Sequence, residues 1–189
     1  MYNMERIKDR LQKMLSVPRL MHSIRVKEEA EKLAMMHNAD IIKAGIAGLL
    51  HDCARDMAYE ELLNRAGKSG IILDSVTIKS PKIIHAVVGP LVAKEEFGIH
   101  DTEVLDAIRY HTTGRKEMRI LEKIVFIADL TEPGRDFRGV EKIRELSERD
   151  IDRAVLFALD QTIIYLIEGN KLIHEDTLKA RNYLYLIEA

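Results

Sequence analysis

A histidine and an aspartate, His51 and Asp52, follow a run of small and apolar residues in the segment GIAGLLHDCARDM (residues 45–57). Solvation is poor at the end of such a run, and burial of an unpaired carboxylate costs several kcal/mol or more. A bound metal ion is one of the few partners that satisfies both side chains. The pair therefore predicts a metal site whose remaining ligands lie elsewhere in the chain.

Four of the seven histidines fall on separate predicted helices at intervals of 26 to 34 residues, each beside apolar neighbours: His22, His51, His85 and His111. Such spacing can bring four side chains together in the core of a helical bundle. His111 also continues the row of Val104 and Ile108 on one face of an amphipathic helix, so its imidazole is expected to point inward. We therefore predict that the four imidazoles converge.

Asp129 adds a second carboxylate to this set. It follows Leu121 and Val125 at four-residue steps, which places an ionisable group on the buried face of a helix. A single inward histidine is more often a hydrogen-bonded core residue than a ligand, but six such residues together favour a metal centre. Four imidazoles and two carboxylates suit transition metals such as iron, manganese or nickel, whereas an all-oxygen calcium or magnesium cage would not need imidazoles.

The elements that position these residues are predicted to be helices, because apolar residues recur at three- and four-residue spacing and glycine and proline are few. We predict an all-α protein with helices over residues 4–15, 19–37, 40–51, 58–66, 81–97, 101–111, 118–130, 139–148, 151–168 and 175–188. The remaining histidines, His37, His100 and His174, lie at predicted helix ends or in loops and are interpreted as solvated surface residues.

Several helix ends carry recognisable signals. Ser80 before Pro81, and Asp101 at the start of a later helix, are typical N-terminal residues, and Gly98 is typical of a C-terminus. The segment 66–81 includes a short β-branched run, but no second strand of matching character is nearby. We therefore predict that this segment is a loop.

The length of 189 residues fits one domain of ordinary size that spans residues 1–189 and is long enough to bury a core without disulfides. The 29 basic and 31 acidic residues give a formal net charge of −2, so duplex nucleic acid and anionic membranes are not expected partners. The longest apolar runs fall short of the roughly 18 residues that span a bilayer, and the N-terminus has no signal-peptide core, so we expect a soluble cytoplasmic protein. Cys53, the only cysteine, excludes an internal disulfide and a zinc site with several thiolates.

The sequence motifs around the predicted ligands are distinctive: MHSIRV at 21–26, LLHDCAR at 49–55, IIHAVVGP at 83–90, AIRYHTTGR at 107–115 and IADLTEPGRDFRGV at 127–140. Together with the H...HD...D pattern they resemble the HD-domain metal-dependent phosphohydrolases, and among these the bacterial YqeK-type family of symmetrical diadenosine tetraphosphate hydrolases. The resemblance covers residues 21–140. It implies a helical HD-domain bundle with a buried two-metal site, most often iron, closed by helices in residues 141–189.

Carried over residue by residue, the resemblance implies that one metal is bound by His22, His51, Asp52 and Asp129. His85 and His111 would bind the second metal, with Asp52 as the bridge. Arg55 stands where the family usually has lysine. Cys53 stands where the family has an aromatic residue, and we interpret Cys53 as a packing residue.

Two metals about 3.5–4 Å apart can share a water, lower its pKa and direct the resulting hydroxide at a phosphorus atom. A polyphosphate also needs cations, and the planar fork of arginine suits this task. We predict catalytic roles for Asp52, Arg55 and Arg135. The predicted substrate contacts are Arg25, Arg55, Thr112, Thr113, Gly114, Arg115, Arg135 and Asp136. A surface charge is the alternative for each arginine, and a helix C-cap is the alternative for Gly114.

The expected activity is therefore symmetrical hydrolysis of dinucleoside tetraphosphates to two nucleoside diphosphates. An HD-domain nucleotidase or phosphodiesterase for another nucleotide would use the same metal centre. A di-iron oxygenase could share the ligands but would not need arginines beside them, and a non-catalytic nucleotide-binding module would tolerate loss of ligands. With 5% aromatic residues and no tryptophan, no adenine-stacking platform can be assigned. The exposed edge of residues 141–189 could form a homodimer contact.

Overall fold

The computed structural model describes residues 4–188, and this part of the chain forms eleven α-helices and no strands. Their bounds are α1 Met4–Met14, α2 Val17–Met36, α3 Ile41–Leu50, α4 Tyr59–Lys68, α5 Ser75–Lys79, α6 Pro81–Phe97, α7 Thr102–Tyr110, α8 Ile120–Thr131, α9 Val140–Arg149, α10 Ile151–Glu168 and α11 Glu175–Glu188. The all-α prediction is confirmed, and the ends of the ten predicted helices differ from these bounds by at most two residues.

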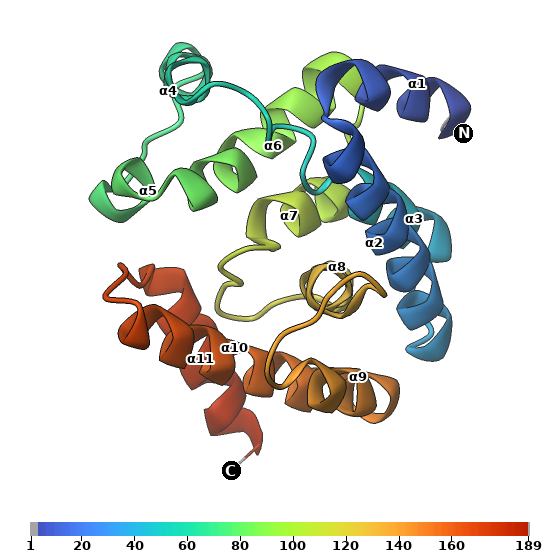
Figure 1. The fold of residues 1–189 in the computed structure, drawn as a ribbon, viewed down its shortest axis with the longest axis vertical. Coiled ribbons are helices and arrows are strands. Elements are labelled where there is room, and N and C mark those ends of the chain that lie inside the picture. Colours follow the sequence, from blue (N-terminus) through green and yellow to red (C-terminus); the bar gives the residue numbers. More distant parts are fainter. Residues whose placement is uncertain (1–3, 189) are drawn as a thin grey trace.

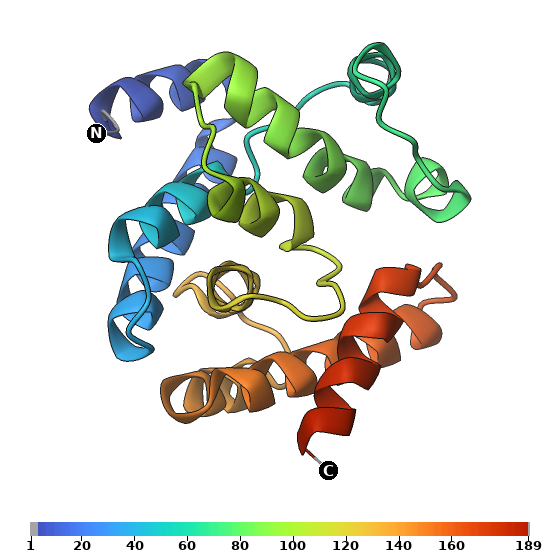
Figure 2. The same ribbon diagram turned by 180° about the vertical axis from the view of Figure 1, so that it is seen from behind.

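The helices form a central group between two outer layers (Figure 1). Helices α7 and α8 lie in the middle, with α4, α5 and α6 on one side and α9, α10 and α11 on the other, and the view from behind shows the same order (Figure 2). The antiparallel pair α2 and α3 packs along α7 and α8. Residues from α2, α3, α6, α7 and α8 therefore meet at the centre of the molecule.

Most of the predicted helix ends have the expected chemistry. The Asp101 carboxylate accepts hydrogen bonds from the backbone N–H groups of Glu103 and Val104 at the start of α7. Gly98 ends α6 in the left-handed region, at φ 66°. Ser80 precedes Pro81 at the start of α6 as predicted, but its side chain makes no capping hydrogen bond.

The prediction of a loop over residues 66–81 is wrong in part, because α4 continues to Lys68 and α5 occupies Ser75–Lys79. The Asp74 carboxylate starts this short helix by accepting hydrogen bonds from the backbone N–H groups of Val76 and Thr77. A local cap thus overrides the β-branched character of the segment.

One hydrophobic core runs through the described residues, from Ile7 in α1 to Leu184 in α11. Helices α2 and α3 approach closely at Gly48, where a Cβ would lie 3.0 Å from the carbonyl oxygen of Val26. Cys53 is 1% exposed, in agreement with a packing role. Within residues 4–188 no helix combines the length and the apolar character that a membrane crossing requires.

Candidate metal centre

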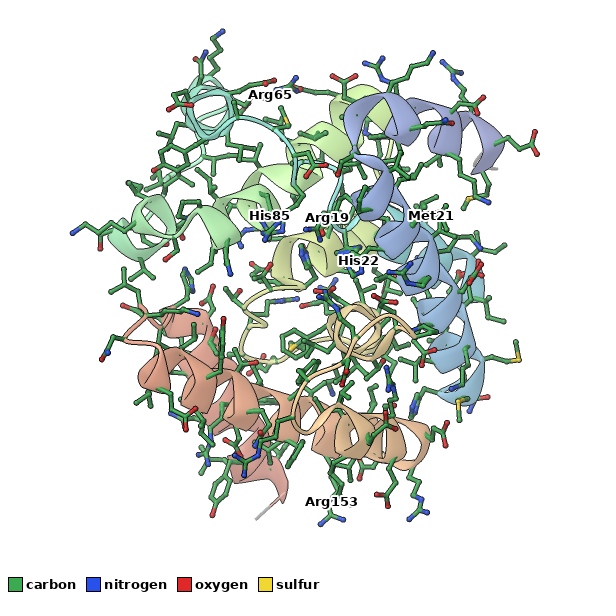
Figure 3. The ribbon with its side chains drawn as sticks, viewed as in Figure 1. Arg19, Met21, His22, Arg65, His85 and Arg153 are labelled. Atoms are coloured by element: carbon green, nitrogen blue, oxygen red, sulfur yellow. The ribbon has the colours of Figure 1, made fainter. Side chains whose placement is uncertain are left out.

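The six predicted ligands come from five helices and meet at the centre of the molecule. The ligands on the helices are His22 in α2, His85 in α6 and Asp129 in α8, while His51 and Asp52 directly follow α3 and His111 follows α7. Figure 3 shows His22 and His85 directed toward the same central region, and the neighbouring Met21 pointing away from it. All four imidazoles and Asp52 are buried.

Asp52 lies between two pairs of imidazoles. Its Oδ1 is 2.9 Å from Nε2 of His85 and 3.7 Å from Nε2 of His111. Its Oδ2 is 3.4 Å from Nε2 of His51 and 3.9 Å from Nε2 of His22. Each oxygen of one carboxylate therefore faces a different pair of ligand nitrogens, an arrangement that suits a bridging carboxylate.

Asp129 faces only one of these pairs. Its Oδ1 is 3.0 Å from Nε2 of His22 and 3.8 Å from Nε2 of His51. Two groups have ligand atoms within 4.8 Å of one another, as a metal ion requires: His22, His51 and Asp129, and His51, Asp52 and His111. The cluster is thus suited to divalent metal binding, with nitrogen and oxygen donors.

Hydrogen bonds from Nδ1 orient two of the imidazoles for ligation. The Nδ1–H group of His51 donates to the Gly48 carbonyl at 2.7 Å, and that of His111 donates to the Ile108 carbonyl at 2.7 Å. In the neutral form of each ring the lone pair is then on Nε2. Among the described residues, Nε2 of His51 is a buried atom without a hydrogen-bond partner. A buried lone pair with no donor to accept from is what a metal-ligating histidine needs, so these residues fit a metal ion.

Glu132 orients the third imidazole, a role the sequence analysis did not predict. It is 2% exposed, and Oε1 accepts a hydrogen bond from Nδ1 of His22 at 3.1 Å. Oε2 accepts from Nε of Arg25 at 2.5 Å and from the N–H of Gly134 at 2.6 Å. Burial raises the pKa of Glu132, but these hydrogen bonds outweigh it and lower the pKa to about 2. Its position three residues after Asp129, on the same helix face, was the available signal.

The electrostatics of the cluster favour the metal-binding protonation states of His85, His111 and both carboxylates. Burial lowers the pKa of His51, but the Asp52 and Asp129 carboxylates outweigh it and raise that pKa, which favours the charged ring. Burial lowers the pKa of His85, and burial with the nearby His51 charge lowers the pKa of His111 to about 3. Burial opposes ionisation of Asp52 and Asp129, but the surrounding histidines hold the pKa of both carboxyls well below the usual range. Neutral imidazoles and ionised carboxylates are the metal-binding forms.

Two arginines contact the carboxylates of the cluster. Nη1 of Arg19 donates to Oδ2 of Asp52 at 2.8 Å, and Arg135 donates to the carboxylate of Asp129 and, through Nε, to its main-chain carbonyl at 2.7 Å. Arg19 had no role predicted from the sequence, although it precedes His22 by one helical turn. With Arg25 these arginines line a cavity of about 290 Å³ that reaches His22.

Two other predicted substrate contacts also lie beside the cluster. Nη1 of Arg55 is 2.8 Å from Nδ1 of His85 and 3.2 Å from the carbonyl oxygen of Lys82. Oγ1 of Thr112 is 3.2 Å from Nε2 of His111. Both side chains are within reach of a group bound at the centre.

The remaining predicted contacts have other surroundings. Arg115 makes a bidentate ion pair with the buried Glu122, at 2.6 and 2.7 Å. Thr113 is buried and donates to the Gly114 carbonyl, and Gly114 adopts φ +64° where a Cβ would meet Ala180 at 3.2 Å. Arg115 thus packs toward α8 and Gly114 toward α11, in keeping with the C-cap alternative for the glycine. Asp136 is exposed.

The interpretation of His174 as a solvated residue is wrong, because its side chain is buried and its Nε2 lies 3.1 Å from Oδ2 of Asp74. Its loop packs against α5, the helix that the sequence analysis missed. His37 is partly buried and its Nε2 donates to the Ser147 carbonyl at 2.6 Å. His100 is exposed, as predicted.

Comparison with known proteins adds independent findings. The HD-domain family model matches residues 19–134. Over 172 residues the chain is 39% identical to a protein of Halalkalibacterium halodurans named symmetrical bis(5'-nucleosyl)-tetraphosphatase, with 91% of each chain covered. A protein of the same name from Bacillus subtilis is 36% identical over 173 residues, which cover 90% of this chain and 91% of that protein.

A solved structure agrees in fold. It is described as a predicted HD superfamily hydrolase involved in NAD metabolism from Clostridium acetobutylicum, and it superposes with a TM-score of 0.95 at 40% identity. The match covers 99% of both chains.

Proposed function

We propose that this chain, which belongs to the HD-domain family, is a metal-dependent hydrolase that cleaves dinucleoside tetraphosphates symmetrically into two nucleoside diphosphates. The names of two relatives, at 39% and 36% identity over about nine tenths of the chain, support the substrate and the position of cleavage. The resemblance of residues 21–140 to symmetrical diadenosine tetraphosphate hydrolases agrees with them. An enzyme of this kind needs a metal centre next to a site for a long, highly charged phosphate chain.

The observation that carries the proposal is the position of Asp52, with each carboxylate oxygen facing a different pair of imidazoles. We propose that one ion is held by His22, His51, Asp52 and Asp129, and a second by Asp52, His85 and His111. The donor set suits iron, manganese or nickel. When bound, two such ions supply a nucleophile from water at neutral pH and neutralise charge on phosphoryl oxygens.

The cavity lined by Arg19, Arg25 and Arg135 is the proposed site of the phosphate chain. It reaches His22, so phosphates that extend from the centre would meet three guanidinium groups. Planar guanidinium groups donate two parallel hydrogen bonds to one phosphate. Three of them suit a tetraphosphate better than a nucleoside monophosphate, which carries a single phosphate group.

Arg55 and Thr112 are proposed as further contacts, because both lie beside ligand imidazoles. We assign Arg115 and Gly114 to packing, because Arg115 pairs with Glu122 of α8 and a Cβ at Gly114 would meet Ala180 of α11. Thr113, whose hydroxyl donates to the Gly114 carbonyl, stays a proposed substrate contact. Arg135 and Arg55 remain the proposed catalytic cations. Each already contacts a proposed ligand, so each lies beside a phosphate group bound at the metal centre.

A second candidate is hydrolysis of another dinucleotide, favoured by the description of the Clostridium acetobutylicum protein as involved in NAD metabolism. NAD carries two phosphates, so it would leave part of the arginine-lined cavity without a phosphate partner. A cytoplasmic location, a nucleotide rather than duplex nucleic acid as the partner, and a homodimer contact through the exposed edge of residues 141–189 stay predictions.

The test is an anaerobic assay of the iron-loaded protein with diadenosine tetraphosphate, NAD and mononucleotides, with products separated by anion exchange. We expect ADP as the sole product from diadenosine tetraphosphate. AMP with ATP would contradict symmetrical cleavage, and turnover of NAD alone would favour the second candidate. Asp52→Asn, which removes the bridging charge, is the matched inactive control.

A further inference from the structure

The four ligand imidazoles differ in what their Nδ1 atoms contact. In three rings Nδ1 faces an acceptor: the Gly48 carbonyl for His51, the Ile108 carbonyl for His111 and the Glu132 carboxylate for His22. In His85, Nδ1 faces a donor, because Nη1 of Arg55 lies 2.8 Å away. A guanidinium group has no acceptor, so Nδ1 of His85 must accept this hydrogen bond.

This contact decides which nitrogen of His85 carries hydrogen. If Nδ1 accepts, then the neutral ring has its hydrogen on Nε2, which donates to Oδ1 of Asp52 at 2.9 Å. Nε2 is the only ring nitrogen of His85 that faces the cluster, since Nδ1 is turned toward Arg55. His85 can therefore bind a metal ion only after its hydrogen moves to Nδ1 and Arg55 leaves. The hydrogen is exchanged with solvent and the ring stays neutral.

Arg55 is also the arginine of this region most available to an anion. Four others have carboxylate partners: Arg19 with Asp52, Arg25 with Glu132, Arg115 with Glu122 and Arg135 with Asp129. Within residues 4–188, Arg55 forms no ion pair with a carboxylate and contacts only the His85 ring and the Lys82 carbonyl by hydrogen bonds. It is partly exposed, so a phosphate can reach it from solvent.

We propose that Arg55 is a positioning residue that couples phosphate binding to completion of the second metal site. With Arg55 on His85, the centre binds one ion tightly and the second weakly. A phosphate group draws the guanidinium away, the hydrogen of His85 moves to Nδ1, and Nε2 becomes a ligand. This inference rests on the proposed function, because it explains how an anionic substrate would assemble the second half of the same site.

The first measurement is a long-range ¹H–¹⁵N spectrum of the imidazoles in the metal-free protein at neutral pH. We expect His51 and His111 to carry hydrogen on Nδ1 and His85 to carry it on Nε2. Arg55→Met removes the donor and should allow the Nδ1–H form of His85 to appear. The inference is overturned if wild-type His85 carries hydrogen on Nδ1.

The second measurement is calorimetric titration with Mn²⁺ in phosphate-free buffer and again with inorganic phosphate. In the wild type, phosphate should tighten binding of the second ion by about tenfold or more, the range typical of groups that orient a ligand. Arg55→Met should bind the second ion with that higher affinity without phosphate. The control is Arg65→Met, which makes the same chemical change on α4, where Arg65 pairs with Glu61 and Glu95 and lies far from His85 (Figure 3).

The outcomes separate this inference from the proposed function. Tight binding of two ions by the wild type without phosphate overturns the role of Arg55 and leaves the hydrolase intact. An equal gain from phosphate in Arg55→Met and the wild type also overturns it, because phosphate would then act on the ions directly. Failure of the wild type to bind any Mn²⁺ would instead count against the metal centre and the proposed function.

Discussion

Glu132 gives the sharpest test of how the fold prepares the metal centre, because it contacts a proposed ligand without being one. Its Oε1 accepts from Nδ1 of His22 and from Nη2 of Arg25, at 3.1 and 3.3 Å. Its Oε2 accepts from Nε of Arg25 and the N–H of Gly134, at 2.5 and 2.6 Å. Glu132→Gln turns one oxygen into an NH₂ group. Whichever oxygen is replaced, the NH₂ group then faces two donors and can accept from neither. At least two hydrogen bonds are then lost.

Two effects of different size follow. Loss of charge-assisted hydrogen bonds at a buried carboxylate should lower the free energy of unfolding of the metal-free protein by about 2–3 kcal/mol. Loss of the group that orients a ligating histidine typically costs 10–100-fold in metal affinity, or about 1.4–2.8 kcal/mol of binding free energy. We therefore expect the dissociation constant of the tighter Mn²⁺ site to rise by about 10- to 100-fold.

A matched control separates the two effects. Glu122 is also buried and pairs with an arginine, Arg115, but contacts none of the proposed ligands. Glu122→Gln should destabilise the fold by a similar amount and leave the Mn²⁺ dissociation constant within about twofold, because groups without a shared partner act independently. Calorimetry gives the affinities and urea unfolding gives the stabilities. Unchanged Mn²⁺ affinity in Glu132→Gln, or equal weakening in both variants, would refute the reasoning.

Three further predictions follow from other parts of the structure. Asp52→Asn should abolish Mn²⁺ uptake and hydrolysis while the far-ultraviolet circular dichroism stays helical; a metal-binding, active variant would contradict the bridging role. Gly48→Ala should lower the free energy of unfolding by about 1–3 kcal/mol, because the new Cβ lies 3.0 Å from a carbonyl oxygen of α2, whereas Gly45→Ala meets only a flexible side chain and should be nearly neutral. Burial raises the pKa of Asp74, but hydrogen bonds from Thr77 and His174 outweigh it and hold that pKa below its usual range. The contribution of Asp74 to stability is therefore full above the unfolded-state pKa of about 3.9 and is lost as pH falls further. Asp74→Asn should make the free energy of unfolding depend less steeply on pH below that value. An unchanged slope would count against this role of Asp74.

Helical periodicity predicted most of this fold because each long helix has one apolar face, which local spacing reveals. The short helix α5 was missed since its formation depends on the side chain of Asp74 and on packing of the His174 loop, contacts between segments 100 residues apart. His174 was misjudged for the same reason. Periodicity reports which face is buried, but not which distant segment covers it.

The convergence of the imidazoles was also predictable, because inward positions on separate helices of a bundle must share one core. The surroundings of each ligand were harder to predict. Glu132 and Arg19 lie one turn from Asp129 and His22, so helical spacing contained the signal, but either residue could have faced solvent. Arg115 was expected at the phosphates because it follows His111 closely in sequence. Its guanidinium group pairs with Glu122, a contact that sequence spacing did not reveal.

Two arginines compensate the negative charge of the two carboxylates at the centre, of which Asp52 is buried and Asp129 partly buried. Asp52 and Asp129 lie close to the same two imidazoles, those of His22 and His51, and two uncompensated charges there would destabilise the fold strongly. Arg19 and Arg135 each contribute a guanidinium group to one of these carboxylates, and both line the cavity that opens toward solvent. The two carboxylates that a metal ion needs are thus stabilised by Arg19 and Arg135, whose side chains border the solvent-facing cavity. The same two cations are then available where a phosphate chain would enter.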